Sequence, residues 1–316
     1  MNKLLFTILF ILISLVSYSQ EGQVLGNALK HEFVTSDWGK KWGLLYTPND
    51  TLKHPVIAFF HGVGEAGTGS SDAALSKLQT HGVFNFIKSG NKMEFINPVN
   101  GKLTKFICIA LQDQYWSPDP GQVYFAILND PLLKNKVDTN GIFFTGLSAG
   151  GQQVLNSLCT NVCLSNGITA IVPMSSAGYN KDLVYLATGK NVWAFHGLED
   201  KTCPYQITES FVASVGSTAK WTKLPPTHGN WNTYYNPTYR ENGMNIYEWM
   251  LSKMPVIILG INRIDIVHTK NKVSWSVDDE SDVLYYEVQE TTDGIHFKTI
   301  KKVLSNGKKN YNIAIN

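Results

Sequence analysis

The residues that point most directly to chemistry surround Ser148. The run Gly146-Leu147-Ser148-Ala149-Gly150 follows the apolar stretch Ile142-Phe143-Phe144-Thr145 and precedes residues typical of a helix. A serine flanked by glycines at a strand-to-helix turn matches the nucleophile elbow, in which the glycines permit a strained turn that exposes the hydroxyl. The bare pattern is weak evidence, and its position between strand and helix strengthens it. Ser148 is therefore a candidate nucleophile for acyl transfer.

A serine hydroxyl is a poor nucleophile at neutral pH, so it needs a histidine to accept its proton and a carboxylate to orient that histidine. Asp200 comes just after the apolar run Val192-Trp193-Ala194-Phe195, and His228 follows it on a loop flanked by Pro and Gly. The order Ser, acid, His is a known order of catalytic triads. Glu199, the neighbour of Asp200, is the competing acid.

The chain has eight histidines, and only His228 has the chain position expected of the base. His196 precedes a tight turn at the end of a predicted strand. A histidine there is more simply explained by a structural role.

The loop from His61 to Gly67 supports two interpretations. It can turn backbone N–H groups towards a developing oxyanion, with Val63 and Ala149 as the candidate donors. It also contains a literal GxGxxG from Gly62 to Gly67, which could bind a dinucleotide pyrophosphate. That motif requires a helix that starts at the loop and an acidic residue about 20 positions later. Neither is present in the sequence, which favours the oxyanion interpretation.

The elements needed to position these residues form a pattern that starts near Gly39 and continues to about Leu251. Short apolar runs alternate with helix-like stretches, which predicts an α/β fold with a mainly parallel sheet whose faces are both covered. The expected strands span residues 55–60, 106–110, 141–145, 168–173 and 192–195. The expected helices lie near residues 71–78, 122–128, 150–159 and 244–251.

Composition limits the partners of this 316-residue chain, which is 43% hydrophobic and 16% charged. That balance predicts a folded protein, and a net charge of +2 offers little attraction for nucleic acid or an anionic membrane. Lys3, the apolar run 4–16 and small residues after it predict a secretory signal peptide over residues 1–19. No later apolar stretch is long enough to span a membrane, so we expect a secreted, periplasmic or cell-surface protein without a membrane anchor after cleavage.

The four cysteines, Cys108, Cys159, Cys163 and Cys203, lack the paired CxxC spacing of a thiolate metal site. Cys159 and Cys163 lie one helical turn apart. The sequence leaves open whether they form a disulfide or remain free.

The sequence pattern changes after Met254-Pro255, which divides residues 20–254 from residues 255–316. Val273-Ser274-Trp275-Ser276-Val277 alternates apolar and polar residues, as in antiparallel sheets. Asp293-Gly294 and Asn306-Gly307 are hairpin signals. The segment resembles the fibronectin type III-like modules of secreted bacterial enzymes. About sixty residues is short for such a sandwich, so we expect a small, incomplete antiparallel module.

Residues 39–251 resemble secreted α/β-hydrolases of the phospholipase/carboxylesterase and esterase-D-like group, which are related to feruloyl and acetylxylan esterases. Four landmarks carry the likeness: the loop 61–67, the run 146–151, the run 193–200 and the segment His228-Gly229-Asn230-Trp231-Asn232 with Tyr247-Glu248-Trp249 after it. The resemblance implies that Ser148 is the nucleophile, Asp200 rather than Glu199 the acid, and His228 the base. It implies Val63 and Ala149 as oxyanion donors. Cys203 departs from the group, which usually carries a small aliphatic residue there.

These observations predict a secreted serine carboxylic ester hydrolase that uses neither metal nor cofactor. Aromatic residues on the predicted loops are candidates for stacking on a sugar or phenolic ring, with Trp116 and Trp231 foremost and with Tyr115, Tyr205, Tyr234 and Tyr235 as further members. Secretion and the appended module suggest esters of a polysaccharide or related polymer as the substrate. A serine peptidase, a polyester depolymerase and a noncatalytic carbohydrate-binding protein with a hydrolase shell remain alternatives.

Overall fold

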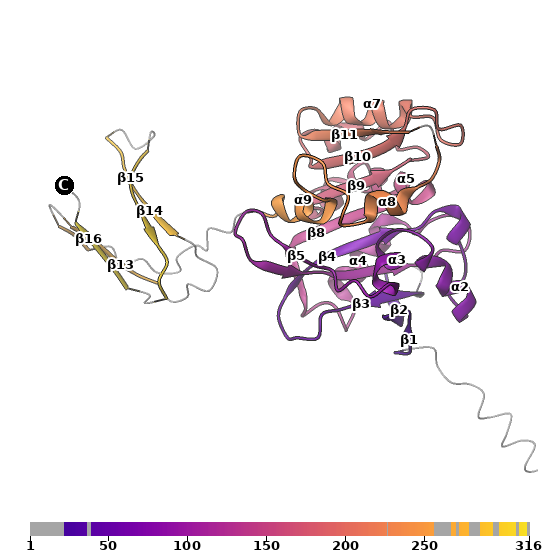
Figure 1. Cartoon of the computed structure of the whole chain (residues 1–316), viewed down its shortest axis with the longest axis horizontal. Coiled ribbons are helices and arrows are strands. Elements are labelled where there is room, and N and C mark those ends of the chain that lie inside the picture. The colour runs from indigo at the N-terminus through magenta and orange to yellow at the C-terminus, as the bar shows by residue number, and fades with distance from the viewer. Residues whose placement is uncertain are drawn as a thin grey trace, which may run out of the picture. The chain divides into compact units, whose positions relative to one another are not determined.

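The computed structural model describes residues 22–36, 39–225, 227–255, 267–269, 272–277, 285–292, 297–307 and 310–314. The signal peptide predicted over residues 1–19 lies outside these ranges. The chain divides into two compact units between Met254 and Pro255 (Figure 1).

Among the described residues of the first unit, nine strands form one sheet in the order β1-β2-β3-β7-β4-β8-β9-β10-β11. The pairs from β1 to β7 are antiparallel, and all pairs from β7 to β11 are parallel. The strands are Val24–Leu25 (β1), Ala28–Thr35 (β2), Gly39–Tyr46 (β3), His54–Phe60 (β4), Ile107–Leu111 (β7), Val137–Leu147 (β8), Ala170–Met174 (β9), Val192–Gly197 (β10) and Ala219–Leu224 (β11). This is the α/β-hydrolase fold, which confirms the predicted fold class. Glu94–Ile96 (β5) and Leu103–Lys105 (β6) form a small separate ribbon.

Helices cover both faces of the sheet because successive strand residues point to opposite sides and both sets are apolar. In β4, Ile57 and Phe59 belong to one buried cluster, whereas Val56, Ala58 and Phe60 belong to the other. The first cluster packs under Asp72–Ser76 (α2), Gly82–Lys88 (α3), Trp231–Tyr235 (α8) and Ile246–Ser252 (α9). The second packs under Pro120–Asn129 (α4), Ala149–Leu158 (α5), Val162–Gly167 (α6) and Gln206–Val215 (α7). The 3₁₀ helices are Val63–Glu65 (η1), Lys77–Gln79 (η2) and Val184–Ala187 (η3).

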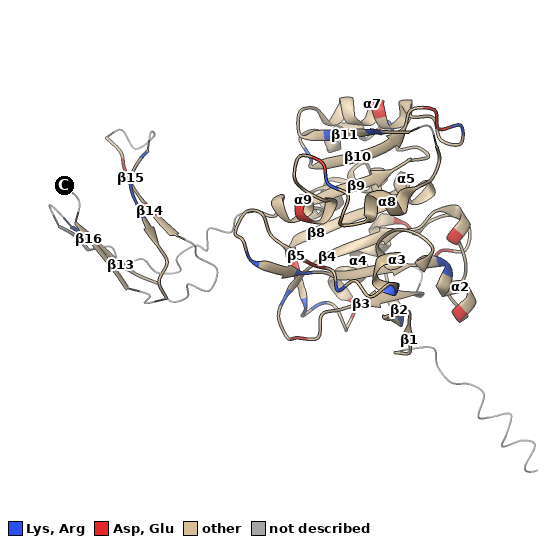
Figure 2. Cartoon of the chain, viewed as in Figure 1, with Lys and Arg blue, Asp and Glu red and all other residues tan. Residues whose placement is uncertain are grey.

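Side-chain caps fix the ends of several helices. Asp119 accepts a hydrogen bond from the amide of Gln122 and Pro120 occupies the first turn, so α4 begins there. Asn245 and Glu248 form a reciprocal capping box at the start of α9. Figure 2 shows acidic and basic residues interspersed over this unit.

The second unit contains two small antiparallel sheets in its described part. Val267–Thr269 (β12), Lys272–Ser276 (β13) and Asn310–Ala314 (β16) form one, and Tyr285–Glu290 (β14) pairs with Lys298–Leu304 (β15) in the other. The rings of Trp275, Tyr286 and Tyr311 pack together and join the two sheets.

One hairpin prediction in this unit is wrong. Asn306-Gly307 does not join two paired strands, because β15 pairs with β14 whereas β16 pairs with β13. The stacking of Tyr311 on Trp275, with ring centroids 5.0 Å apart, holds β16 against β13 instead. Asp293-Gly294, the other predicted turn, lies outside the described residues, between the paired strands β14 and β15.

Candidate active site

Ser148 lies at the turn between the central strand β8 and helix α5. Its backbone has φ 54° and ψ −117°, a strained conformation that side-chain-bearing residues rarely adopt. Its amide donates to the carbonyl of Met174 over 2.9 Å, which ties the turn to the end of β9. A Cβ atom at Gly150 would lie 2.0 Å from the carbonyl oxygen of Phe60, so only glycine fits where α5 crosses β4. This arrangement is the elbow that the sequence predicted.

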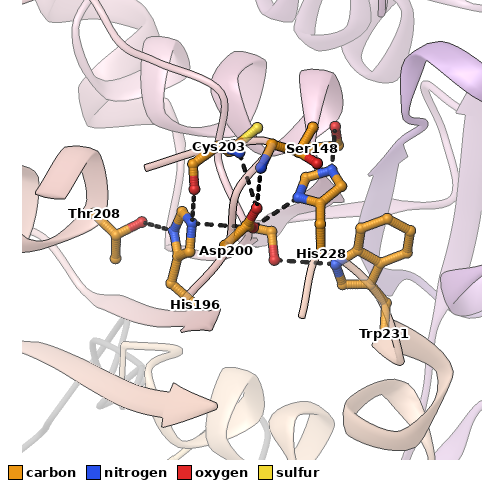
Figure 3. A network of polar contacts seen from close by, with 9 residues as sticks. Ser148, His196, Asp200, Cys203, Thr208, His228 and Trp231 are labelled. Atoms are coloured by element: carbon orange, nitrogen blue, oxygen red, sulfur yellow. Dashed lines mark hydrogen bonds and ion pairs between the residues drawn. The ribbon is translucent and has the colours of Figure 1, made fainter. Parts of the chain in front are cut away.

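The structure brings Ser148, Asp200 and His228 together from three loops at the carboxyl end of the sheet (Figure 3). His228 Nε2 lies 3.0 Å from Ser148 Oγ. His228 Nδ1 lies 2.7 Å from Asp200 Oδ2. With Nδ1 protonated, the imidazole donates to the carboxylate and presents its other nitrogen as the acceptor for the serine proton. Glu199 is exposed, whereas Asp200 makes the contact with His228, so the geometry favours Asp200 as the acid.

The carboxylate of Asp200 is buried, and the surrounding loop keeps it charged. Burial opposes ionisation, but the amides of Cys203 and Thr202, each 2.9 Å from Oδ1, and the imidazole of His228 outweigh this effect. Together they hold the pKa of Asp200 below its ordinary value. A carboxylate that stays ionised is the partner that an imidazolium formed during the reaction requires.

His196 supports the loop that carries Asp200 and Cys203. Its Nδ1 lies 2.7 Å from Thr208 Oγ1, and its Nε2 lies 2.8 Å from the carbonyl of Cys203. Burial lowers the pKa of His196, so the neutral ring that donates to Cys203 and accepts from Thr208 satisfies both contacts. His196 Nε2 is also 3.4 Å from Asp200 Oδ2. These bonds provide the structural role expected of this histidine.

Val63 and Ala149 are the first residues of η1 and α5. First-turn amides have no acceptor within their own helix, so both N–H groups remain available to an external oxygen. Two backbone bonds hold the η1 turn, from Glu65 to Gly62 and from Ala66 to Val63. The GxGxxG stretch, residues 62–67, contains this single 3₁₀ turn, and α2 begins only at Asp72. Within these described residues, no α-helix starts at the loop as a dinucleotide motif requires.

The sequence did not reveal the side chains that support this loop. Buried His61 joins it to the end of β7, because Nδ1 contacts the carbonyl of Gly62 at 2.8 Å and Nε2 accepts from the amide of Asp113 at 3.1 Å. The carboxylate of Glu65 lies against Gly62, where an added Cβ would be 2.9 Å from Glu65 Oε2. Burial raises the pKa of Glu65, while the amides of Gly62 and Glu65 and the charge of Lys77 partly oppose the rise.

Trp231 links the loop that carries His228 (the histidine loop) to the segments that carry His81 and Ser175. Its ring meets that of His228 edge-on with centroids 5.1 Å apart, and that of His81 with centroids 5.2 Å apart. Its Nε1 donates to Ser175 Oγ over 3.2 Å. His81 Nε2 in turn lies 3.8 Å from Glu65 Oε1. Trp231, one of the two predicted substrate-binding residues, therefore lies beside the candidate base.

Trp116, the other predicted substrate-binding residue, lies on the loop after β7 and is 39% exposed. No contact between it and the triad is seen in the described part of the chain. Tyr235 is fully buried, and its hydroxyl lies 2.8 Å from Thr145 Oγ1. Tyr205 stacks on Trp221. The prediction of a substrate contact is wrong for Tyr235, because neighbouring side chains cover its ring completely.

The described residues contain no group of three or more His, Cys, Asp or Glu side chains arranged to hold a metal ion. All four cysteines are free thiols in the structure, Cys159 and Cys163 included. Burial raises the pKa of the Cys203 thiol to about 11. Within the same described ranges, no helix has the length and apolar character of a membrane span.

No family model and no curated protein matches this chain. Solved structures do resemble it at low identity. A thermostable esterase has 17% identity and a TM-score of 0.47, over 72% of this chain and 60% of that one. Esterase 2 of Thermogutta terrifontis, phosphorylated by paraoxon, has 16% identity and a TM-score of 0.45, over 71% and 90%. The acylaminoacyl peptidase of Pyrococcus horikoshii has 15% identity and a TM-score of 0.46, over 71% and 40%.

The chain spans 60% of the length of the first of these proteins.

Proposed function

We propose that this protein is a serine hydrolase that cleaves carboxylic esters through an acyl-enzyme. One observation carries the proposal: Ser148, held in a strained elbow, lies 3.0 Å from an imidazole whose other nitrogen is 2.7 Å from a buried carboxylate. A serine of purely structural importance needs neither the strained backbone nor the aligned pair of partners.

In the proposed reaction, His228 Nε2 removes the hydroxyl proton as Ser148 Oγ attacks the ester carbonyl. The amides of Val63 and Ala149 stabilise the oxyanion of the tetrahedral intermediate. His228 then gives its proton to the departing alcohol, leaving an acyl group on Ser148. A water molecule that loses its proton to His228 attacks this acyl-enzyme, and collapse of the second intermediate releases the acid and restores the hydroxyl. Asp200 stays ionised throughout and stabilises the imidazolium.

The same triad chemistry also cleaves peptides and polyesters, and pocket shape selects among them. We propose esters attached to a polysaccharide or related polymer as the substrate, with export to the periplasm, cell surface or medium. The predicted signal peptide and the second β unit support this proposal. Mass spectrometry of the protein recovered from its native cells would test export, because cleavage near residue 19 would leave a chain that begins close to Gln20.

The proposed function is tested by comparing purified wild-type protein with Ser148→Ala on p-nitrophenyl acetate, feruloyl esters, acetylated xylan and a chromogenic peptide. We expect ester hydrolysis by the wild type and a fall in kcat of about 10³-fold or more in the variant. Circular dichroism confirms that the variant folds. Turnover of the peptide alone would favour the peptidase alternative, and activity that survives the substitution would exclude Ser148 as the nucleophile.

A further inference from the structure

A groove of about 530 Å³ lies next to the loop from His61 to Gly67, which carries Val63 and is called the oxyanion loop below. Trp42 of β3 forms one side, the loop after β7 forms another, and Gly67 and Thr68 bring the end of the oxyanion loop to its edge. Gln153, on the second turn of the helix that starts after Ser148, also lines it. The two loops are tied together, since the amide of Gly67 donates to the carbonyl of Asp113 over 2.8 Å. A group bound in this groove would therefore lie between the end of the oxyanion loop and the helix that follows Ser148.

The charged residues of the groove are already engaged. Lys41 forms an ion pair with Asp113, and Lys40 lies 3.0 Å from Glu32. Asp119 is used as the cap of α4. A strongly charged ligand would have to compete with these contacts, which favours a neutral one.

Neutral hydrogen-bonding groups dominate the rest of the lining. Four glutamines contribute, namely Gln112, Gln114, Gln122 and Gln153. The Nε2 of Gln112 donates to the carbonyls of Glu65 and Ala74 over 2.7 and 2.8 Å. Gln112 Oε1 and Ser117 Oγ are buried and have no hydrogen-bond partner among the described residues. Buried polar atoms without partners are rare in proteins, and both of these belong to residues that line the groove.

Two aromatic side chains also line the groove. Trp42 is half-buried in the groove, whereas Tyr115 is 79% exposed at its edge. The amide of Tyr115 donates to Asp113 Oδ1 over 3.2 Å, and this bond holds the turn that presents the ring. A large ring left in water at a polar groove is suited to stacking on the apolar face of a flat ligand that carries polar edges.

We propose that this groove binds a neutral sugar unit, so that the ester substrate is a carbohydrate ester whose glycosyl part occupies the groove. A pyranose ring has the required properties: no charge, hydroxyl groups that both donate and accept, and a C–H face that stacks on aromatic rings. The inference rests on the proposed ester hydrolysis and adds the place where the sugar of the substrate binds.

The test has a binding arm and a kinetic arm. In the binding arm, full-length Ser148→Ala protein is titrated calorimetrically with xylotriose, mannotriose and cellotriose. The same titrations are repeated after Tyr115→Ala or Gln114→Ala is added. The matched control is Tyr185→Ala, which removes a tyrosine that is 64% exposed on η3 and does not line the groove. We expect at least one trisaccharide to bind, binding to weaken about tenfold or more with either groove substitution, and no change with the control.

In the kinetic arm, kcat/KM is measured for an acetylated oligosaccharide and for p-nitrophenyl acetate. Tyr115→Ala should lower the first about tenfold or more and leave the second within about twofold. Equal loss on both substrates, or absence of binding by all three sugars to a folded protein, would overturn the sugar site. Sugar binding without any ester hydrolysis by the wild type would instead retain the site and refute the proposed hydrolase function.

Discussion

Asn232 and Gly82 join two parts of the active-site wall that are 150 positions apart in the chain. The carboxamide Oδ1 of Asn232 accepts a hydrogen bond of 2.9 Å from the amide of Gly82, and its Nδ2 donates to the carbonyl of Thr80 over 3.2 Å. Asn232 lies in the first turn of α8, next to Trp231 and close to His228. The segment it binds carries His81, which contacts both Trp231 and Glu65. The histidine loop and the oxyanion loop are therefore connected through this bond.

Asn232→Ala should lower both stability and kcat, because it removes the acceptor of a partly buried amide and frees the segment that carries His228. We expect the free energy of unfolding to fall by about 1–3 kcal/mol. Chemical denaturation and ester kinetics measure the two effects. Asn129→Ala is the control, since this exposed carboxamide donates to the carbonyl of Phe125 in its own helix. Equal effects of the two substitutions would show that the link between the loops is unimportant.

Asp200→Asn should reduce kcat by about 10³–10⁴-fold, because an amide can neither favour the productive histidine tautomer nor stabilise the imidazolium. Glu199→Gln should leave kcat within about twofold, since Glu199 is exposed and Asp200 alone of the two contacts His228. Steady-state kinetics on p-nitrophenyl acetate compare the two variants. A larger loss in Glu199→Gln would mean that the acid has been placed one residue too far along the chain.

Glu65 should position the oxyanion loop through its side-chain acceptor rather than through its charge. Glu65→Gln retains an oxygen that can accept from the amide of Gly62, so kcat should stay within a few fold. Glu65→Leu removes the acceptor, and kcat should fall about tenfold or more with a smaller change in KM. Equal kinetics of the Gln and Leu variants would contradict this role.

The same residue gives a pH dependence of stability with a defined sign. Burial raises the pKa of Glu65 in the folded state, so its favourable contribution is complete below the ordinary carboxyl pKa and is lost as pH rises through the folded value. Gln at this position does not titrate. The unfolding free energy of Glu65→Gln relative to wild type should therefore increase from pH 4 to pH 8. His81 and Lys77 also face this group and stay unchanged in the comparison. A difference that stays constant or decreases would contradict the buried carboxyl.

Removal of residues 255–316 should leave turnover of p-nitrophenyl acetate within about twofold. The first unit contains the sheet, both of its buried clusters and every proposed catalytic residue. If the second unit attaches the enzyme to a polymer, loss should be confined to insoluble substrate, through a lower effective concentration at the surface. A folded, monodisperse 20–254 protein with a collapsed rate on the small ester would show that the second unit contributes to catalysis.

Local sequence predicted the central parallel strands well. Residues 56–60 of β4 and 142–144 of β8 are continuously apolar because helices cover both faces of the sheet, and such runs are a clear strand signal. The antiparallel strand β2 and the edge strand β11 were not predicted. Their sequences, ALKHEFVT and AKWTKL, mix charged and apolar residues, and only pairing with β3 and β10 fixes them as strands.

The triad could be predicted because each member follows a recognisable strand or lies in a motif, and parallel strands bring their carboxyl ends to one edge. The contacts that support the triad and the oxyanion loop could not be predicted from the sequence. Glu65, His81 and Trp231 meet only after three distant segments fold together, and no local pattern marks them as partners. The same holds for the groove, whose four glutamines come from one loop and two helices.

Covalent trapping would identify the nucleophilic residue directly. Full-length protein is treated with an excess of an organophosphonate that carries a good leaving group, then analysed by intact mass and by peptide mapping. We predict one phosphonyl group per chain, located on Ser148, with simultaneous loss of esterase activity. The adduct should be absent from Ser148→Ala, much slower to form in His228→Ala, and unchanged in Cys203→Ala, which removes the neighbouring thiol. Full labelling of Ser148→Ala, or a wild-type protein that hydrolyses esters but is never labelled, would contradict a serine acyl-enzyme at this site.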